Sequence, residues 1–521
     1  MSERDERPEL AELRARLHAT TDEARPDAVA KRRKTGQRTA RENVADLVDE
    51  GSFVEYGALA LAAQRSTRTV DDLVRASPAD GIVCGIGTVN GALVGEARAR
   101  TMVLAYDYTV FAGTQGLASH RKLDRMLALA AQHRVPIVLF AEGGGGRPND
   151  TDTHTVAALD TTSFHAFASL SGLVPRVGIV SGRCYAGNAA LLGCCDVIVA
   201  TDDSNVGMAG PVMIEAGGLG KFAPEEIGPA DVQTKNGVID VRVRDEAEAV
   251  AVAKKYLSYF QGPIAPGPCA PQETLRDAMP ASRRRGYKVR PIVETIADTG
   301  SVLELRREFG RSLVTALVRI EGIPLGIVAS DTGHLGGAID ADAADKAARF
   351  FQLCDAFSLP IVSLVDTPGF MVGPQAEQTA LVRHVSRMFV AAASLSVPYF
   401  TVVLRRGYGL GAQAMAGGHF HASVFTVSWP TGEFGGMNLE GAVRIGMRKQ
   451  LDAIEDPTQR EQTAQAMIAE AQRRGSAINM ASLLELDAVI DPAETRAWIL
   501  RGVRAAPPPP RDGRRRIVDA W

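Results

Sequence analysis

The chain has 521 residues, a mass of 55.4 kDa and a formal net charge of −3, with 23% charged and 45% hydrophobic residues. The length predicts two to four domains, and the balance is typical of a globular protein, with no basic excess to bind nucleic acid or an anionic membrane. The 51 glycines indicate many tight turns and close backbone approaches.

The first 50 residues predict an arm. Leu10, Leu13 and Leu17 have helical spacing, and a basic run follows from Lys31 to Arg41. We expect a solvated helix and arm; the alternative is that the basic run contacts anionic groups of a cofactor or partner. The N-terminus lacks the apolar region of a secretory signal, and the apolar stretch 389–404 is too short to span a bilayer. We therefore expect a cytoplasmic protein.

The strongest pattern is an internal repeat that relates the first half of the chain to the second. PIVLFAEGGGGR from Pro136 matches PIVSLVDTPGF from Pro360, and VPRVGIV from Val174 matches VPYFTVV from Val397. In both copies an amphipathic helix precedes an apolar strand; its apolar residues are Leu123, Met126 and Ala130 in the first copy and Ala343, Ala347, Phe350, Cys354 and Phe357 in the second. This alternation predicts an α/β fold of two tandem domains with largely parallel sheets.

The repeat and the composition set the expected boundaries. The region between the copies is rich in proline and carries a basic cluster, which is typical of a linker. The tail, with PPPP at 507–510 and RDGRRR beyond, is expected to be mobile or attached to a neighbour. We expect an arm over 1–50, a first domain over 51–261, a linker over 262–290, a second domain over 291–505 and a tail over 506–521.

The turns that follow the buried strands are the first place to look for a site, because ligands of open α/β sheets bind beyond the carboxyl ends of strands. These turns are 142–147 and 184–188 in the first copy and 366–370 and 408–412 in the second. Glycines there let backbone N–H groups approach a ligand, and two converging N–H groups form an oxyanion hole. The alternative is that the glycines are only flexible turns.

Other site chemistries find little support. The sequence has neither a phosphate-binding G-x-x-x-x-G-K-[ST] motif, nor a dinucleotide fingerprint in its expected place, nor a G-x-S-x-G elbow. The six cysteines form no C-x-x-C pair, and His419 and His421 are a weak candidate metal pair, so we expect no metal. Glu142 and Asp366 follow strands, and we expect them to hold the turns rather than to act as catalytic acids.

The motifs in their order carry a resemblance. GSFVE, YDYTVFAGTQG, EGGGGR and CYAGNAA are followed by PIVSLVDTPGF, RRGYGLGAQAM and SWPTGEFGGMNLEGAV. This order resembles the carboxyltransferase (β) subunits of biotin-dependent acyl-CoA carboxylases, of the propionyl-CoA or methylcrotonoyl-CoA carboxylase type, nearly end to end. The resemblance implies two tandem crotonase-like domains of the ClpP/crotonase superfold, the first holding acyl-CoA and the second biotin.

Such enzymes move a carboxyl group from N1 of carboxybiotin to the α-carbon of an acyl-CoA through an enolate. The resemblance implies two backbone oxyanion holes, formed by Gly144, Gly145, Ala186 and Gly187 on the thioester and by Gly369, Leu410 and Gly411 on biotin. It further implies three substrate-binding residues, Tyr408, Gln413 and Asn188, with Gln413 in the acyl pocket.

The resemblance also implies partners. Biotin would be carried by another polypeptide, because this chain has no A-M-K-M biotinylation site. The expected partner is a biotin carboxylase and biotin carrier (α) subunit, and the expected oligomer is a hexamer whose active sites lie between the first domain of one subunit and the second domain of another.

The chain departs from its relatives where glycine is usual, at Ala186 and Leu410, each of which adds a Cβ where glycine would permit an unusual φ. We expect an acyl group other than propionyl. Three alternatives remain: a biotin-dependent decarboxylase subunit, a crotonase-like hydratase or hydrolase without biotin, and a non-catalytic scaffold subunit.

Overall fold

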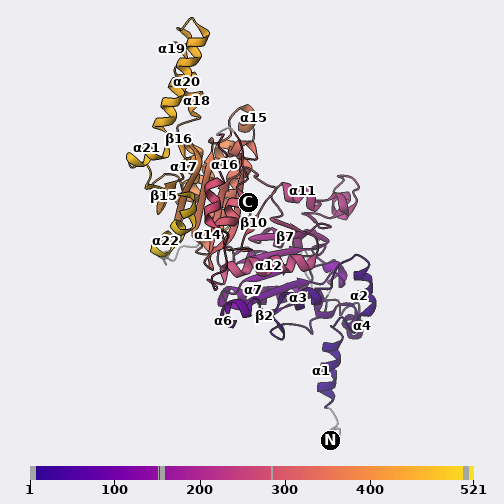
Figure 1. Ribbon diagram of the computed structural model, residues 1–521. Coiled ribbons are helices and arrows are strands. Elements are labelled where there is room, and N and C mark those ends of the chain that lie inside the picture. Colours follow the sequence, from indigo (N-terminus) through magenta and orange to yellow (C-terminus); the bar gives the residue numbers. More distant parts are fainter. Residues whose placement is uncertain (1–6, 151, 153–158, 283–284, 508–515) are drawn as a thin grey trace. The chain divides into compact units, whose positions relative to one another are not determined.

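The computed structural model describes residues 7–150, 152, 159–282, 285–507 and 516–521 (Figure 1). The chain divides into two compact units: residues 1–262 with 517–520 form the first, and residues 263–516 with Trp521 form the second. Most of the proline-rich and basic part of the predicted tail, residues 508–515, lies outside the described residues.

The first unit contains a seven-stranded sheet. Its first two pairings are antiparallel and the others are parallel. A separate two-stranded parallel sheet pairs β6 (Arg183–Tyr185) with β8 (Asn205–Gly207). The strand order of the main sheet is β1 (Val54–Glu55), β2 (Ile82–Thr88), β3 (Arg100–Tyr106), β4 (Ile137–Phe140), β5 (Arg176–Val180), β7 (Val197–Thr201) and β9 (Val241–Val243).

The second unit contains an eight-stranded sheet with the same succession of pairings. Again the first two pairings are antiparallel and the rest parallel. The eighth strand, β16 (Glu433–Gly435), pairs with the end of β14. The strand order is β10 (Leu303–Leu305), β11 (Leu313–Ile320), β12 (Ile323–Ser330), β13 (Ile361–Thr367), β14 (Tyr399–Tyr408), β15 (Phe425–Ser428) and β17 (Ala488–Val489).

The α/β class predicted from the sequence is confirmed, and most strand pairings in each sheet are parallel, as predicted. Two antiparallel pairings make each sheet mixed, and they occur where consecutive strands pair directly. β11 and β12 are joined by Glu321 and Gly322 alone, both at positive φ (49° and 74°), and such a two-residue turn can only connect antiparallel neighbours.

Helices cover both faces of the first sheet. Leu123, Met126 and Ala130 of α7 are buried against strand residues in one apolar core, as their spacing predicted. On α12, Val250 and Ala253 are buried. The helices of this unit with six or more residues are α1 (Pro8–His18), α2 (Pro26–Arg33), α3 (Ala40–Leu47), α4 (Val70–Ala76), α7 (Leu117–His133), α8 (Ser163–Ala168), α9 (Gly187–Gly193), α10 (Pro211–Ala216), α11 (Ala230–Lys235) and α12 (Glu246–Phe260).

The second unit repeats this plan. The predicted helix before β13 is α14, where Ala343, Ala347, Phe350 and Cys354 are buried. Figure 1 shows α18, α19 and α20 extending beyond the sheet. The helices with five or more residues are α13 (Arg290–Ile296), α14 (Ala341–Ala356), α16 (Leu381–Ala393), α17 (Gly409–Met415), α18 (Leu439–Gly446), α19 (Arg448–Asp452), α20 (Pro457–Arg474), α21 (Ala477–Ser482) and α22 (Thr495–Ala505).

The N-terminal arm is solvated only in part. α1 buries none of its residues, as predicted. In α2, α3 and the turn between them, by contrast, Arg32, Gln37, Thr39 and Asn43 are buried, so the expectation of a solvated arm is wrong for this stretch. A capping box of Thr39 and Glu42 begins α3 and satisfies its first N–H groups.

No described helix is long and apolar enough to cross a membrane. Within the described ranges no three His, Cys, Asp or Glu side chains gather as metal ligands, and His421 donates its backbone N–H to the Nδ1 of His419 at 2.9 Å.

Lys346 on α14 gives the fold a pH dependence that can be measured. Its side chain is buried, and the ammonium donates to the carbonyls of Phe309 (3.0 Å) and Leu313 (2.7 Å). Burial lowers the pKa of Lys346 from 10.5 to about 7. Between these two values the unfolded chain binds more protons than the native one, so the free energy of unfolding rises with pH.

We expect Lys346→Met to flatten this rise. The measurement is the melting temperature of both proteins from pH 7 to pH 10. Equal slopes for the two proteins would contradict the assignment.

Candidate functional site

The first unit brings its two glycine turns together. β4 leads through Glu142 into Gly143 and Gly145, whose φ values of 151° and 86° favour glycine. A Cβ built on Gly145 would lie 2.6 Å from the Cβ of Ala186 and 3.3 Å from the nitrogen of Gly187. The turn after β4 therefore packs directly on the start of α9.

The second unit does the same with the turns after β13 and β14. Gly369 has φ 121°, and α17 begins at Gly409, with φ 56°. A Cβ built on Gly411 would lie 2.7 Å from the Cα of Gly369 and 2.9 Å from the nitrogen of Phe370. No side chain larger than hydrogen fits between these two turns.

The same backbone hydrogen bonds hold both strand-end turns. In each unit a residue of the preceding loop donates its N–H to the carbonyl of the positive-φ glycine and accepts from the N–H two residues further on. The residues are Gln115, Gly145 and Arg147 in the first unit and Ile339, Gly369 and Met371 in the second, with distances of 2.7 to 3.1 Å. Equivalent residues are separated by the same offset as Pro136 and Pro360, so the sequence repeat is also a repeat of geometry.

Not all of the predicted amide donors are free in the first unit. The N–H of Gly145 donates to Oδ1 of Asn188 at 3.0 Å, and that of Ala186 donates to the carbonyl of Gly207 at 3.2 Å. Over the described residues, the amides of Gly144 and Gly187 find no acceptor. Of the four amides predicted to form the oxyanion hole of the first unit, these two therefore remain as candidate donors.

In the second unit the N–H of Gly369 donates to Oγ1 of Thr367 at 3.1 Å. The amides of Leu410 and Gly411 have no acceptor in the described part of the chain, and Leu410 is exposed. Gly145 and Gly369 thus match, because each gives its N–H to a side-chain oxygen.

Sequence reasoning missed one further amide in each unit. The N–H groups of Gly146 and Phe370, which follow the positive-φ glycines at equivalent positions, also lack an acceptor among the described residues. The repeat contained the signal, because Gly146 and Phe370 follow equivalent glycines in the two matching turns.

The three predicted substrate-binding side chains differ in exposure. Asn188 is fully buried; its Nδ2 donates to the carbonyls of Gly113 and Glu142, so it braces the turn and leaves no group for a substrate. Tyr408 is also buried, and its hydroxyl donates to Glu433. Gln413 is exposed on α17. The hydrogen bonds of Asn188 therefore favour a bracing role in the turn over the expected substrate contact.

The two positions where relatives usually have glycine, Ala186 and Leu410, differ in backbone conformation. Ala186 adopts φ 51° and ψ −123°, a conformation that strains any residue with a Cβ. Leu410 lies inside α17 and has no positive φ. The expectation that its Cβ stands where an unusual φ is needed is therefore wrong. The positive φ of that turn falls on Gly409 instead, the counterpart of Ala186.

Two buried acids hold the turns, as the sequence predicted. Arg32 donates twice to Glu142, at 2.5 and 2.7 Å. Asp366 accepts from the Nε atoms of Arg405 (2.9 Å) and Arg406 (2.6 Å). Burial raises the pKa of Glu142 to about 7, and Arg32 only partly offsets this. Neither acid projects into open space beside the free amides.

A cavity of about 450 Å³ borders the second turn. Tyr408, Arg406 and Glu433 line it from β14 and β16, and α20 closes one side with Gln465, Ile468 and Gln472. Its volume lies within the range of small-molecule sites.

The chain matches the carboxyl transferase domain family over residues 31–511. It belongs to the carboxyl transferase family. This confirms the resemblance to the carboxyltransferase subunits of biotin-dependent acyl-CoA carboxylases, so the chain is a carboxyltransferase. The methylmalonyl-CoA carboxyltransferase 12S subunit of Propionibacterium freudenreichii is 33% identical over 94% of this chain and 92% of its own length. A long-chain acyl-CoA carboxylase β4 subunit of Mycobacterium tuberculosis is also 33% identical, over 95% and 93%.

Solved structures place this carboxyltransferase among the same proteins. A single-chain, multi-domain long-chain acyl-CoA carboxylase has 56% identity and a TM-score of 0.90 over 96% of this chain. The chain spans about half of that enzyme's length, at 49%. The transcarboxylase 12S hexamer with methylmalonyl-CoA bound has 30% identity and a TM-score of 0.83, covering 98% of this chain and 97% of its own.

The strain at Ala186 gives a direct test of the first turn in this carboxyltransferase. We expect Ala186→Gly to raise the free energy of unfolding by about 1 kcal/mol, because relief of the strained φ outweighs the extra entropy of glycine in the unfolded chain. The measurement is the urea midpoint, with Ala190→Gly in α9 as the control, which should lower it. A lower midpoint for Ala186→Gly would contradict the strain.

Proposed function

We propose that each unit of this carboxyltransferase uses one pair of backbone amides to stabilise one developing negative charge, the first on an acyl-CoA thioester and the second on biotin. The observation that carries this proposal is the repeated geometry: at two equivalent positions, Gly146 and Phe370 after the strand and Gly187 and Leu410 at the helix start, both copies leave an N–H group without an acceptor among the described residues. Such a duplication supports descent of both units from one crotonase-like fold.

In the first unit the donors are Gly187 with Gly144 or Gly146. An α-proton next to a thioester is removed only if the enolate oxygen is stabilised, and amides held in fixed positions do this without reorganisation. Asn188 fixes those amides by accepting from the N–H of Gly145 and donating to the carbonyls of Gly113 and Glu142. The carboxylate of Glu142 is paired with Arg32 and does not face the donors, which argues against a hydratase or hydrolase that needs an acidic side chain there.

In the second unit the donors are Leu410 and Gly411, with Phe370 beside them. The cavity of about 450 Å³ along Tyr408 fits a ring of biotin's size, and its lining is polar, as the ureido group requires. When bound, biotin supplies the carboxyl group and, after giving it up, a base for the α-proton. The residues of the chain orient the ring and donate to its ureido oxygen.

The remaining parts of the proposal concern partners. Biotin arrives on a separate carrier that belongs to a biotin carboxylase and carrier subunit, and copies of this chain assemble as a hexamer, as the related 12S protein does. The six cysteines form no disulfide, which fits a reducing cytoplasm.

We further propose a long-chain acyl-CoA as substrate. The structure with 56% identity is a long-chain acyl-CoA carboxylase, whereas a propionyl-CoA carboxylase β chain from Saccharopolyspora erythraea is 31% identical. This agrees with the expectation of an acyl group other than propionyl.

The amide of Leu410 can be removed without breaking its helix. Leu410 is the second residue of α17, where proline is tolerated because the N–H has no helical partner. We expect Leu410→Pro to lower kcat for carboxyl transfer from carboxylated carrier to acyl-CoA about 10²- to 10³-fold, the usual effect of losing one oxyanion donor.

The control is Leu410→Ala, which keeps the N–H and loses only an exposed side chain. We expect it to retain activity within about threefold of the wild type. Equal losses in both variants would mean that the side chain, not the amide, matters. Absence of any transfer by the wild-type protein would favour a scaffold, and release of carbon dioxide from carboxylated acyl-CoA in its place would favour a decarboxylase.

Chain-length preference tests the substrate. With acyl-CoAs from three to sixteen carbons, we expect kcat/KM to be at least about tenfold higher for the longest than for propionyl-CoA, since several buried methylenes contribute. Gln413→Asp should reduce this ratio by placing a charge in the acyl pocket, whereas the exposed Gln462→Asp should not. A clear preference for propionyl-CoA would refute the substrate assignment.

A further inference from the structure

The two strand-end acids are equivalent in position but differ in the origin of their arginines. Asp366 is paired with Arg405 and Arg406, which lie on the neighbouring strand β14. Glu142, its counterpart in the first copy of the repeat, is paired with Arg32 from the arm helix α2. Both acids are buried, and each lies immediately before the turn that carries the free amides.

Among the described residues of the first unit, no strand arginine is paired with Glu142. β14 runs without interruption through Arg405, whereas in the first unit β5 ends at Val180 and β6 begins at Arg183. Gly182, between them, stands at the position equivalent to Arg405 and has φ 86°. Arg183, equivalent to Arg406, is exposed and pairs with Glu225 at 2.7 Å.

Side chains of the arm occupy the space that a side chain at position 182 would need. A Cβ built on Gly182 would lie 2.7 Å from Oε1 of Glu142 and would overlap the amide of Gln37. Gln37 in turn accepts from Nη1 of Arg32 at 2.8 Å. The glycine and the arm are therefore complementary: a side chain at position 182 would displace the ends of Gln37 and Glu142 from the places where they meet Arg32.

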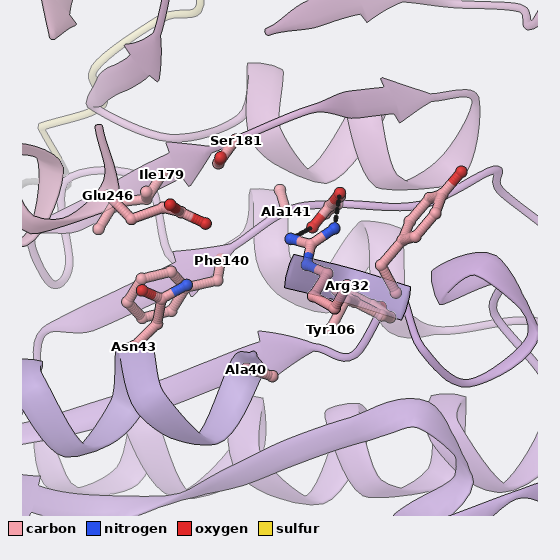
Figure 2. Close-up of a pocket in the computed structure, with 11 residues that line it drawn as sticks. Arg32, Ala40, Asn43, Tyr106, Phe140, Ala141, Ile179, Ser181 and Glu246 are labelled. Atoms are coloured by element: carbon pink, nitrogen blue, oxygen red, sulfur yellow. Dashed lines mark hydrogen bonds and ion pairs between the residues drawn. The ribbon is translucent and has the colours of Figure 1, made fainter. Parts of the chain in front are cut away.

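The guanidinium of Arg32 is held from several sides. Its Nε donates to the carbonyl of Arg38 at 2.8 Å, and the backbone N–H of Arg38 donates to Glu246 at 3.0 Å. The ring of Tyr108 lies 5.6 Å from the guanidinium carbon. Figure 2 shows Arg32, Asn43 and Glu246 around the small cavity beside this ion pair. Such a network fixes the orientation of the Glu142 carboxylate.

We propose that Arg32 is a positioning residue for the first glycine turn, supplied by the N-terminal arm in place of the strand arginines that the second unit uses. The arm thereby supports the turn that we propose to bind acyl-CoA. This inference rests on the proposed function. Glu142 transmits the effect, because its backbone carbonyl accepts from Asn188 and its next residue begins the turn.

The pH dependence follows from the same groups. Glu142 faces Arg32 from α2, Glu246 from α12, Asp107 after β3 and Cys184 from β6. Desolvation raises the pKa of Glu142 to about 7, so the carboxylate that holds Arg32 forms as the pH rises through neutrality. Without Arg32 this pKa rises further, since the charge that compensates its burial is gone.

The test compares two reactions of the full-length protein with carboxylated biotin carrier. The first is carboxyl transfer to acyl-CoA; the second is loss of the carboxyl group from the carrier without acyl-CoA, which uses the second unit alone. For Arg32→Gln we expect transfer to fall at least tenfold through kcat, its pH profile to move to higher pH, and the second reaction to stay within twofold of the wild type. Arg32→Lys should recover part of the transfer rate.

Two further variants keep the test decisive. Arg33→Gln changes an exposed arginine of the same helix and should leave both reactions unchanged. If Arg32→Gln does not fold, the double variant Arg32→Gln/Glu142→Gln buries no unpaired charge and should show the same selective loss of transfer. Unchanged transfer, or parallel loss of both reactions, would overturn the proposal; a wild-type protein that transfers nothing would instead overturn the proposed function.

Discussion

An amide N–H that is to stabilise a charge on a ligand must have no partner in the protein, and the function proposed for the two units places this constraint on both. A strand-end turn with several unpaired amides would be mobile unless its remaining polar groups were fully bonded. In each turn, an amide that is bonded within the protein is followed by one that is not. The N–H groups of Gly145 and Gly369 donate to Asn188 and Thr367, while those of the residues that follow them, Gly146 and Phe370, have no acceptor in the described part of the chain.

A buried ion pair supports each turn. The carboxylate that precedes the turn is bonded to arginine, and this bond fixes the direction in which the strand ends. Because an acid left alone in such a place would be costly, the arginine and the acid stabilise the site only as a pair. In the proposed site, the rigidity of the free amides therefore depends on charges that do not themselves contact the ligand.

Much of this arrangement could be predicted from the sequence. The internal repeat identified the equivalent turns, the helix spacing of Leu123 and Ala343 identified the flanking helices, and the position of Glu142 and Asp366 indicated their supporting role. The repeat could not reveal which amides are bonded, because the acceptors come from elsewhere: Asn188 on α9 and the carbonyl of Gly207 on β8. Nor could spacing place Arg32 on Glu142, since the described residues between α12 and α13 contain no α-helix equivalent to α2 in the second copy.

The interruption between β5 and β6 at Gly182 has a consequence for how the two halves diverged. A duplicated fold begins with interchangeable halves, but once one half depends on a segment outside the repeat, the halves can no longer replace each other. A fragment that begins at the edge of the repeat would contain the strands and the glycine turn of the first half. It would lack Arg32, whose guanidinium pairs with Glu142 before that turn. Under the role proposed for Arg32, the functional boundary of that half lies near residue 26, where α2 begins, rather than where the repeated sequence starts.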